Sequence, residues 1–249
     1  MNVLKRKLQD NVVTTGGWIQ IGHPSIARIF AHAGFDWICI DLQHGIINKE
    51  TIRDMITAIE RYGKVPVIRL PVYSCSEVGS YLDMGVLGII VPDIRSVDDV
   101  ANVIKTCKYP PDGIRSFGYC QANVYGAEFE SYISRANKEI SIIAQIEHTD
   151  ALNNIHGILS LDGLDATFIG PLDLKGSVDI EMNGMLFDQM TSKYLNACET
   201  HHKPAGIHVL DPSLIAINTA VEQGYKMIAV GTDGIFLNQM AKEVIKYEL

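Results

Sequence analysis

The sequence lacks the features that mark secreted, membrane-spanning or cysteine-rich proteins. Nowhere do about 18 uncharged apolar residues follow one another, and the basic stretch 1–17 has no apolar core of the signal-peptide kind. The 5 cysteines are odd in number and form no C-x-x-C pair, which excludes a cysteine-based zinc site and favours reduced, structural thiols. We therefore expect a soluble cytoplasmic protein that has no membrane partner.

An excess of positive charge is also missing. The chain carries 29 acidic and 21 basic side chains, a formal net charge of -8, and the basic residues form no cluster. Such a surface repels phosphate backbones, so we expect no nucleic-acid partner. The hydrophobic content of 47% is sufficient for a large core, and 249 residues suit a single domain that spans 1–249.

Short runs rich in Val and Ile alternate along the chain with longer segments of helical period. The segments between the runs place apolar residues at helical spacing, as in Ile52, Met55, Ile56 and Ile59. The predicted strands span residues 16–22, 37–41, 65–70, 87–93, 141–147, 165–170, 204–210 and 225–231. Eight strand–helix units predict an α/β fold, a (β/α)8 TIM barrel with an additional N-terminal helix.

An open, doubly wound sheet is the alternative fold. It would need a glycine-rich phosphate turn after the first strand, and the stretch "IGHPSI" is not such a turn. The irregular segment 109–126 is longer than an ordinary connection, so we expect it to lie over the barrel mouth and to be functional.

Polar residues follow the apolar strands at the points where the strands end. Since the carboxyl ends of barrel strands meet at one mouth, side chains placed there converge on a shared site. The residues expected in this site are Asp41, His44, Arg69, Asp93, Glu147, Asp173, His208 and Asp233.

Two of these carboxylates, Glu147 and Asp173, follow consecutive strands. Carboxylate oxygens are hard donors, and a pair of them would hold Mg²⁺ or Mn²⁺ while leaving coordination positions open for substrate and water. The alternative is that Glu147 caps the next helix or pairs with a surface lysine.

A second unit combines Asp41, His44 and Arg69. An Asp that accepts a hydrogen bond from one imidazole nitrogen raises the basicity of the other nitrogen, which suits a general base. In the alternative, Asp41 caps a helix beside an exposed His44. Arg69 would supply a fixed cation for a carboxylate or an oxyanion, unless it serves structurally to lock Asp41 in place.

In several blocks the sequence resembles the HpcH/HpaI family, the class II pyruvate aldolases of the 2,4-dihydroxyhept-2-ene-1,7-dioate aldolase type. The resemblance covers nearly the whole chain, and its most specific elements are D-x-x-H at 41–44, I-R at 68–69, Q-x-E at 145–147 and "FIGPLDL" at 168–174. It implies a cytoplasmic metal-dependent lyase that reversibly cleaves a 4-hydroxy-2-oxo acid to pyruvate and an aldehyde through a metal-bound pyruvate enolate.

The resemblance also implies residue roles. Glu147 and Asp173 would hold Mg²⁺, Mn²⁺ or Co²⁺, Arg69 would contact the keto or enolate oxygen, and His44 with Asp41 would form the acid/base pair. The substrate-binding residues would be Trp18, Gln145, Gly170, Pro171, Leu172 and His208, with backbone amides around Gly170 and Leu172 binding the pyruvate carboxylate. Members of this family usually assemble as hexamers, trimers of dimers with an exchanged C-terminal helix, for which residues 235–249 are the candidate here.

Three positions depart from the family pattern: Gln43 where Glu is common, Lys175 after "GPLDL", and His208 where relatives often have an apolar residue. They point to an unusual acceptor. Two further functions compete with the aldolase: a condensing or decarboxylating enzyme that acts on oxaloacetate, as a citrate-forming relative would, and a non-catalytic ligand-binding barrel. The second would be expected to lack an intact metal pair or base.

Overall fold

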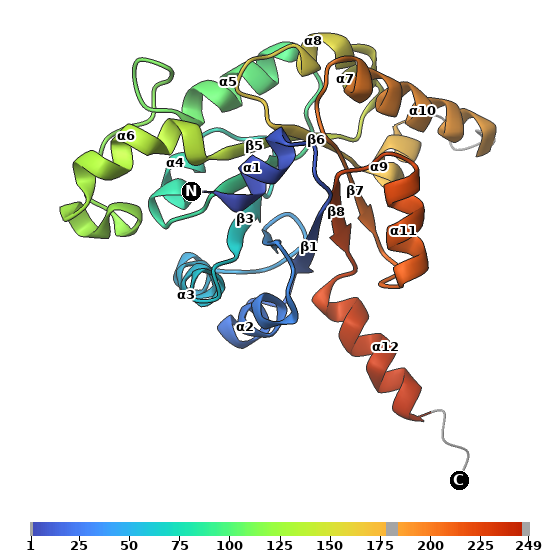
Figure 1. Cartoon of the computed structure of the whole chain (residues 1–249), viewed down its shortest axis with the longest axis horizontal. Coiled ribbons are helices and arrows are strands. Elements are labelled where there is room, and N and C mark those ends of the chain that lie inside the picture. The colour runs from blue at the N-terminus through green and yellow to red at the C-terminus, as the bar shows by residue number, and fades with distance from the viewer. Residues whose placement is uncertain (1, 178–183, 246–249) are drawn as a thin grey trace.

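Eight parallel strands close into a barrel in which each strand pairs with its neighbours in chain order and β1 pairs with β8 (Figure 1). The computed structural model describes residues 2–177 and 184–245. The strands are β1 (Thr14–Ile19), β2 (Trp37–Asp41), β3 (Val65–Arg69), β4 (Gly88–Val91), β5 (Ser141–Ile146), β6 (Ala166–Ile169), β7 (Ala205–Val209) and β8 (Met227–Val230). The predicted (β/α)8 barrel is confirmed, and each predicted strand overlaps an observed one.

Strand composition explains the closed sheet. Every residue of β2, β3 and β5 is buried, because side chains on one face fill the barrel and those on the other pack under the helices. Glycine is required where β1 passes the bulky Trp37 of β2: a Cβ atom on Gly16 would lie 2.3 Å from the indole ring.

Helices surround the barrel, as the helical periodicity predicts. Their bounds are α2 (Pro24–Ala33), α3 (Lys49–Glu60), α4 (Val78–Asp83), α5 (Val97–Cys107), α6 (Phe129–Glu139), α7 (Thr149–Asn153), α8 (Ile155–Leu159), α9 (Pro171–Gly176), α10 (Gly184–Thr200), α11 (Leu214–Glu222) and α12 (Asp233–Ile245). None of the helices described here is long and apolar enough to cross a membrane.

The additional N-terminal helix, α1 (Val3–Gln9), covers the amino-terminal end of the barrel. Its Leu4 and Leu8 belong to the same buried cluster as Trp37 and the other interior side chains. Asn2, just before the helix, donates hydrogen bonds to the carbonyl oxygens of Leu87 and Glu139 next to the starts of β4 and β5. Because α1 covers this end, we expect ligands to approach the barrel from the carboxyl-terminal end.

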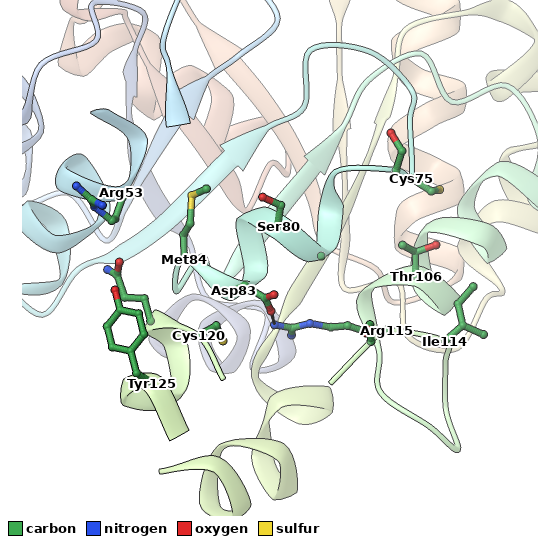
Figure 2. Close-up of a pocket in the computed structure, with 14 residues that line it drawn as sticks. Arg53, Cys75, Ser80, Asp83, Met84, Thr106, Ile114, Arg115, Cys120 and Tyr125 are labelled. Atoms are coloured by element: carbon green, nitrogen blue, oxygen red, sulfur yellow. Dashed lines mark hydrogen bonds and ion pairs between the residues drawn. The ribbon is translucent and has the colours of Figure 1, made fainter. Parts of the chain in front are cut away.

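The irregular segment 109–126 does not lie where we expected it. It ends in the short 3-10 helix η1 (Gln121–Gly126), which packs on α4 and α6, and the cleft at the barrel mouth contains none of its residues. The buried Arg115 fixes it to the flank of the barrel, because its Nη2 donates a hydrogen bond to Asp83 Oδ1 at 2.7 Å (Figure 2). The Arg115 guanidinium also lies 4.4 Å from the Tyr109 ring centroid. This pairing with α4 turns the segment away from the mouth.

Among the described residues, the last helix, α12, contacts the barrel through its first turn. Figure 1 shows it running away from the barrel, and residues 237–245 are all exposed, among them Leu237, Met240, Val244 and Ile245. Its first residue, Asp233, is 1% exposed and accepts hydrogen bonds from the backbone amides of Gln20 at 3.1 Å and Ile21 at 2.8 Å. The predicted site residue Asp233 therefore has a structural role: it joins α12 to the end of β1.

Candidate active site

Asp41 ends β2 directly beside Arg69, which ends β3 in the same register. The guanidinium binds the carboxylate through two hydrogen bonds, from Nε to Oδ1 at 2.9 Å and from Nη2 to Oδ2 at 2.7 Å. Trp18 Nε1 and the Gln20 side-chain amide also donate to Oδ2, at 3.2 and 3.0 Å. Of the two roles considered for Arg69, locking Asp41 in place is the one that these contacts show.

These donors determine the charge state of Asp41. Burial alone would raise the pKa of its carboxyl group, but the hydrogen bonds and positive charge of Arg69, together with Gln20 and Trp18, lower that pKa to about 2. Asp41 is therefore a permanent anion that holds Arg69 at the mouth in one orientation.

His44 lies close to Asp41 but is joined to it only through the backbone. Its amide donates to Asp41 Oδ1 at 3.3 Å, and the Gln43 amide donates to the same oxygen at 3.0 Å. Within the described ranges no hydrogen bond links the His44 ring to Asp41, and the His44 side chain is exposed. The predicted acid/base pair is thus adjacent but not in direct side-chain contact.

The carboxylate of Glu147 lies just beyond β5 and is 6% exposed. Its Oε1 accepts a hydrogen bond from the Asp93 backbone amide at 2.6 Å, and its Oε2 accepts one from the Gln145 side chain. Burial raises the pKa of Glu147, and the negative charge of Asp173 raises it further, against the opposing effects of the Asp93 amide and the Arg69 charge. The negative charges of Glu147 and Asp173 therefore lie close enough together for mutual repulsion.

Glu147 and Asp173 line one cleft of about 560 Å³ at the mouth, together with Gln43, Asp93 and Arg95. Glu147 faces this cleft rather than capping a helix, because the residue that caps α7 is His148. Asp173 lies in the first turn of α9, a short helix that sequence periodicity did not reveal.

The side chains in this cleft fit a hard divalent cation. The Gln145 carbonyl oxygen, Oε1, is buried without a hydrogen-bond partner in the described part of the chain, directly beside Glu147. A cation at Glu147 and Asp173 would relieve the repulsion between the carboxylates and could also accept this oxygen as a ligand. Residues 2–177 and 184–245 contain no group of three His, Cys, Asp or Glu side chains arranged for a metal, so the remaining positions would fall to substrate and water.

The segment after β6 differs in part from the predicted carboxylate-binding loop. The Gly170 amide donates to the Ile146 carbonyl at 3.0 Å, and Pro171 has no amide hydrogen, so neither can bind a carboxylate through its backbone. Gly170 instead provides space, because a Cβ atom there would lie 2.8 Å from Glu147 Cβ. Leu172, at 71% exposure, is the first residue of this loop whose amide could serve.

Trp18 and His208 pack on one another beside the Asp41–Arg69 pair. Their ring centroids are 4.7 Å apart, and the Arg69 guanidinium lies 4.9 Å from the Trp18 ring centroid. The predicted substrate-binding residues Trp18 and His208 therefore flank the Asp41–Arg69 pair.

The sequence prediction missed Gln20, and it named Asp93 without identifying the backbone amide through which Asp93 contributes. Gln20 follows β1 directly, so the strand-end rule could have identified it. The Asp93 amide could not have been found in this way, because it reaches Glu147 only through the left-handed backbone of Asp93, at φ 54°.

The HpcH/HpaI aldolase/citrate lyase profile matches residues 14–239. The chain belongs to this family. A hydroxypyruvate/pyruvate aldolase of Roseobacter denitrificans is 30% identical over 98% of this chain and 96% of its own length. A 4-hydroxy-2-oxovalerate aldolase of Novosphingobium aromaticivorans is 31% identical over 94% of this chain and 89% of its own length.

Solved structures agree with this assignment. An HpcH/HpaI family protein of Burkholderia cenocepacia superposes with a TM-score of 0.92 at 28% identity, covering 99% of this chain and 98% of that one. The citrate synthase SbnG superposes with a TM-score of 0.82 at 26% identity, covering 97% and 96%. The predicted family and the expectation of an aldolase-type enzyme are thus confirmed, and the similar proteins include both aldolases and a citrate synthase.

Proposed function

We propose that this protein is a metal-dependent lyase that reversibly cleaves a 4-hydroxy-2-oxo acid into pyruvate, or a close analogue, and an aldehyde. The observation that carries the proposal is the pair of repelling carboxylates, Glu147 and Asp173, in one cleft near the Arg69 cation. The aldolase names of the two relatives support this reaction class.

Glu147 and Asp173 would hold Mg²⁺, Mn²⁺ or Co²⁺, with Gln145 as a neighbouring oxygen donor. The bound cation would supply the positive charge that stabilises an enolate. Arg69 would add a second cation on the same oxygen. Because Asp41 takes the Nε hydrogen and one hydrogen of Nη2, both hydrogens of Nη1 and the second hydrogen of Nη2 are left for the substrate.

His44 would handle the proton on the hydroxyl side of the bond. Cleavage between C3 and C4 requires loss of the proton on the C4 hydroxyl, and formation of the bond requires its return. The exposed ring at the rim of the mouth can exchange that proton with solvent between turnovers. Asp41 would support His44 indirectly. Its Oδ1 accepts a hydrogen bond from the His44 backbone amide at 3.3 Å, and this bond fixes the loop that follows β2.

The test is a matrix of aldehydes incubated with pyruvate and Mg²⁺ or Mn²⁺, with products identified by mass and each reaction repeated in EDTA. We expect aldol products that depend on the metal. Metal-independent turnover, or no product with any aldehyde, would contradict the proposal; binding of 2-oxo acids without turnover would favour the non-catalytic barrel.

A condensing or decarboxylating enzyme that acts on oxaloacetate is the second candidate, favoured by the similarity to the citrate synthase SbnG. Substitution of His44 distinguishes the two. His44→Ala should slow aldol cleavage far more than oxaloacetate decarboxylation, because decarboxylation removes no hydroxyl proton. Equal losses in the two reactions would remove His44 from the role of hydroxyl base.

The protein would act in the cytoplasm as a homo-oligomer, a hexamer built as a trimer of dimers. The support is α12, whose outer part contacts little of its own barrel and exposes Leu237, Met240, Val244 and Ile245. A second copy of the chain would cover this helix. Truncation after Gly234 should reduce the sedimentation coefficient to that of a smaller assembly, and an unchanged coefficient would argue against exchange of the helix.

A further inference from the structure

We propose that His208 makes the active site selective for substrates that carry a hydroxyl group in addition to the C4 hydroxyl of the aldol. The inference rests on the proposed aldolase function and names the class of substrate that this chain prefers. It is carried by the hydrogen bonding and position of one imidazole ring.

The ring nitrogen of His208 that carries the hydrogen is Nε2. His208 Nε2 lies 2.8 Å from the Gly231 carbonyl oxygen, and a carbonyl can only accept. Nε2 is therefore the donor, and in the neutral ring Nδ1 keeps an unshared electron pair. Burial lowers the pKa of His208 to about 4 against the opposing effect of the Gly231 carbonyl, so the ring is neutral near pH 7.

The other ring nitrogen, Nδ1, is free to accept a hydrogen bond. In the described ranges, Nδ1 has no hydrogen-bond partner, and it does not belong to the buried polar atoms that are sealed from solvent. The ring packs on Trp18 at 4.7 Å, and Trp18 in turn lies beneath Arg69 at 4.9 Å. An unpaired hydrogen-bond acceptor thus belongs to the stack of side chains, His208, Trp18 and Arg69, that contains the cation proposed to hold the keto oxygen.

A ligand must carry a hydrogen-bond donor to interact with Nδ1. The carboxylate and keto group of pyruvate are acceptors only, and a simple alkyl aldehyde also has no donor, so Nδ1 offers them nothing. A hydroxyl group donates to such a nitrogen. The C4 hydroxyl is assigned to His44, which leaves either a hydroxyl on the carbon next to the keto group, as in hydroxypyruvate, or one on the aldehyde, as in glycolaldehyde.

The structure also explains why a histidine serves here. An apolar residue at position 208 would pack on Trp18 equally well but would present no acceptor. A hydroxyl placed against an apolar wall would lose its water without gaining a partner, which is the usual reason that such pockets reject hydroxylated ligands.

The experiment compares four substrate pairs: pyruvate or hydroxypyruvate, each with propanal or glycolaldehyde, in Mg²⁺. His208→Phe keeps a ring on Trp18 but removes both nitrogens, and His208→Gln keeps one donor for Gly231 and one acceptor. We expect His208→Phe to lower the ratio of kcat/KM for hydroxylated over plain substrate by about 10- to 100-fold. His208→Gln should recover most of that ratio, and the substrate whose ratio falls identifies the hydroxyl that is recognised.

The exposed His156 on α8 provides the matched control, since His156→Gln should leave every ratio unchanged. Equal losses for all four pairs in His208→Phe, or an unchanged ratio, would overturn the proposal. Titration calorimetry of hydroxypyruvate and pyruvate separates it from the proposed function. A binding preference that His208→Phe abolishes, in a protein without aldol turnover, would support the His208 site and refute the aldolase.

Discussion

Two buried carboxylates at the mouth, Asp41 and Glu147, differ in nearly every contact. Asp41 is surrounded by donors from Trp18, Gln20 and Arg69, which hold its pKa at about 2. Glu147 has two neutral donors, and burial with a neighbouring carboxylate raises its pKa. The comparison shows that Asp41 is paired with a cation of its own chain, whereas Glu147 has no ion pair with a basic side chain in the described residues.

The largest expected effect concerns the proposed metal ligands, Glu147 and its neighbour Asp173. Asp173→Ala should lower metal-stimulated turnover about a thousandfold, since it would remove one of the two proposed protein ligands. Asp150→Ala, which removes an exposed carboxylate at the start of α7, is the control and should leave turnover within a factor of two to three (~0.5 kcal/mol). Full activity of a rigorously metal-free Asp173→Ala enzyme would show that Asp173 is not a ligand of a catalytic metal.

Opposite effects on stability are expected when each carboxylate is neutralised. Asp41→Asn should lower the free energy of unfolding by about 3–5 kcal/mol, because Arg69 would remain buried without a counter-charge. Glu147→Gln should leave the metal-free protein equally stable or raise that free energy by about 1 kcal/mol, because it removes a disfavoured buried charge. Urea unfolding in EDTA measures both, and equal destabilisation would show that the two environments do not differ as described.

Acid should reveal the same asymmetry. The pKa of Asp41 is lowered from 3.8 to about 2, so its contribution is fully present above pH 4 and is lost as the pH falls towards 2. The loss should reach about 1 kcal/mol at pH 3 and about 2 kcal/mol at pH 2. The raised pKa of Glu147 acts in the opposite direction, since protonation in mild acid removes the free-energy cost of burying its negative charge. Urea midpoints from pH 5 to pH 3 for the wild type, Asp41→Asn and Glu147→Gln separate the two contributions.

The smallest effect concerns one donor to Asp41. Trp18→Phe removes the indole N–H that lies 3.2 Å from Oδ2, and Trp37→Phe removes the equivalent bond to Thr14, also 3.2 Å. Both should destabilise the fold, with about 1 kcal/mol arising from the lost hydrogen bond. Only Trp18→Phe should raise the pKa of Asp41 and flatten the acid dependence of stability. A flattened dependence in Trp37→Phe as well would assign the effect to packing.

The barrel and the location of its site follow from the sequence because each apolar strand ends in a polar residue, and parallel strands bring those ends to one mouth. The partners at the mouth do not follow in the same way. Asp41 precedes His44 by three residues, yet Arg69 on the next strand occupies its oxygens. Sequence spacing cannot rank these partners, because the choice depends on strand register and side-chain reach.

Short elements limited the prediction further. Residues 171–176 form α9, but six residues beginning with proline are too few to show a helical period. The segment between β5 and β6, where the sequence predicts helix, forms two short helices that divide at Asn154, whose side chain donates to the carbonyls of Arg95 and Asp150. In both places local capping and turn geometry decide the backbone, and hydrophobic periodicity does not report on them.

The attachment of α12 has a mechanical consequence. Asp233 holds the backbone amide of Gln20, and the side chain of Gln20 holds Asp41 at 3.0 Å. A displacement of the projecting helix would therefore be transmitted through Asp233 and Gln20 to the carboxylate that orients Arg69. A neighbouring molecule bound to the outer part of α12 would in this way change the position of Arg69.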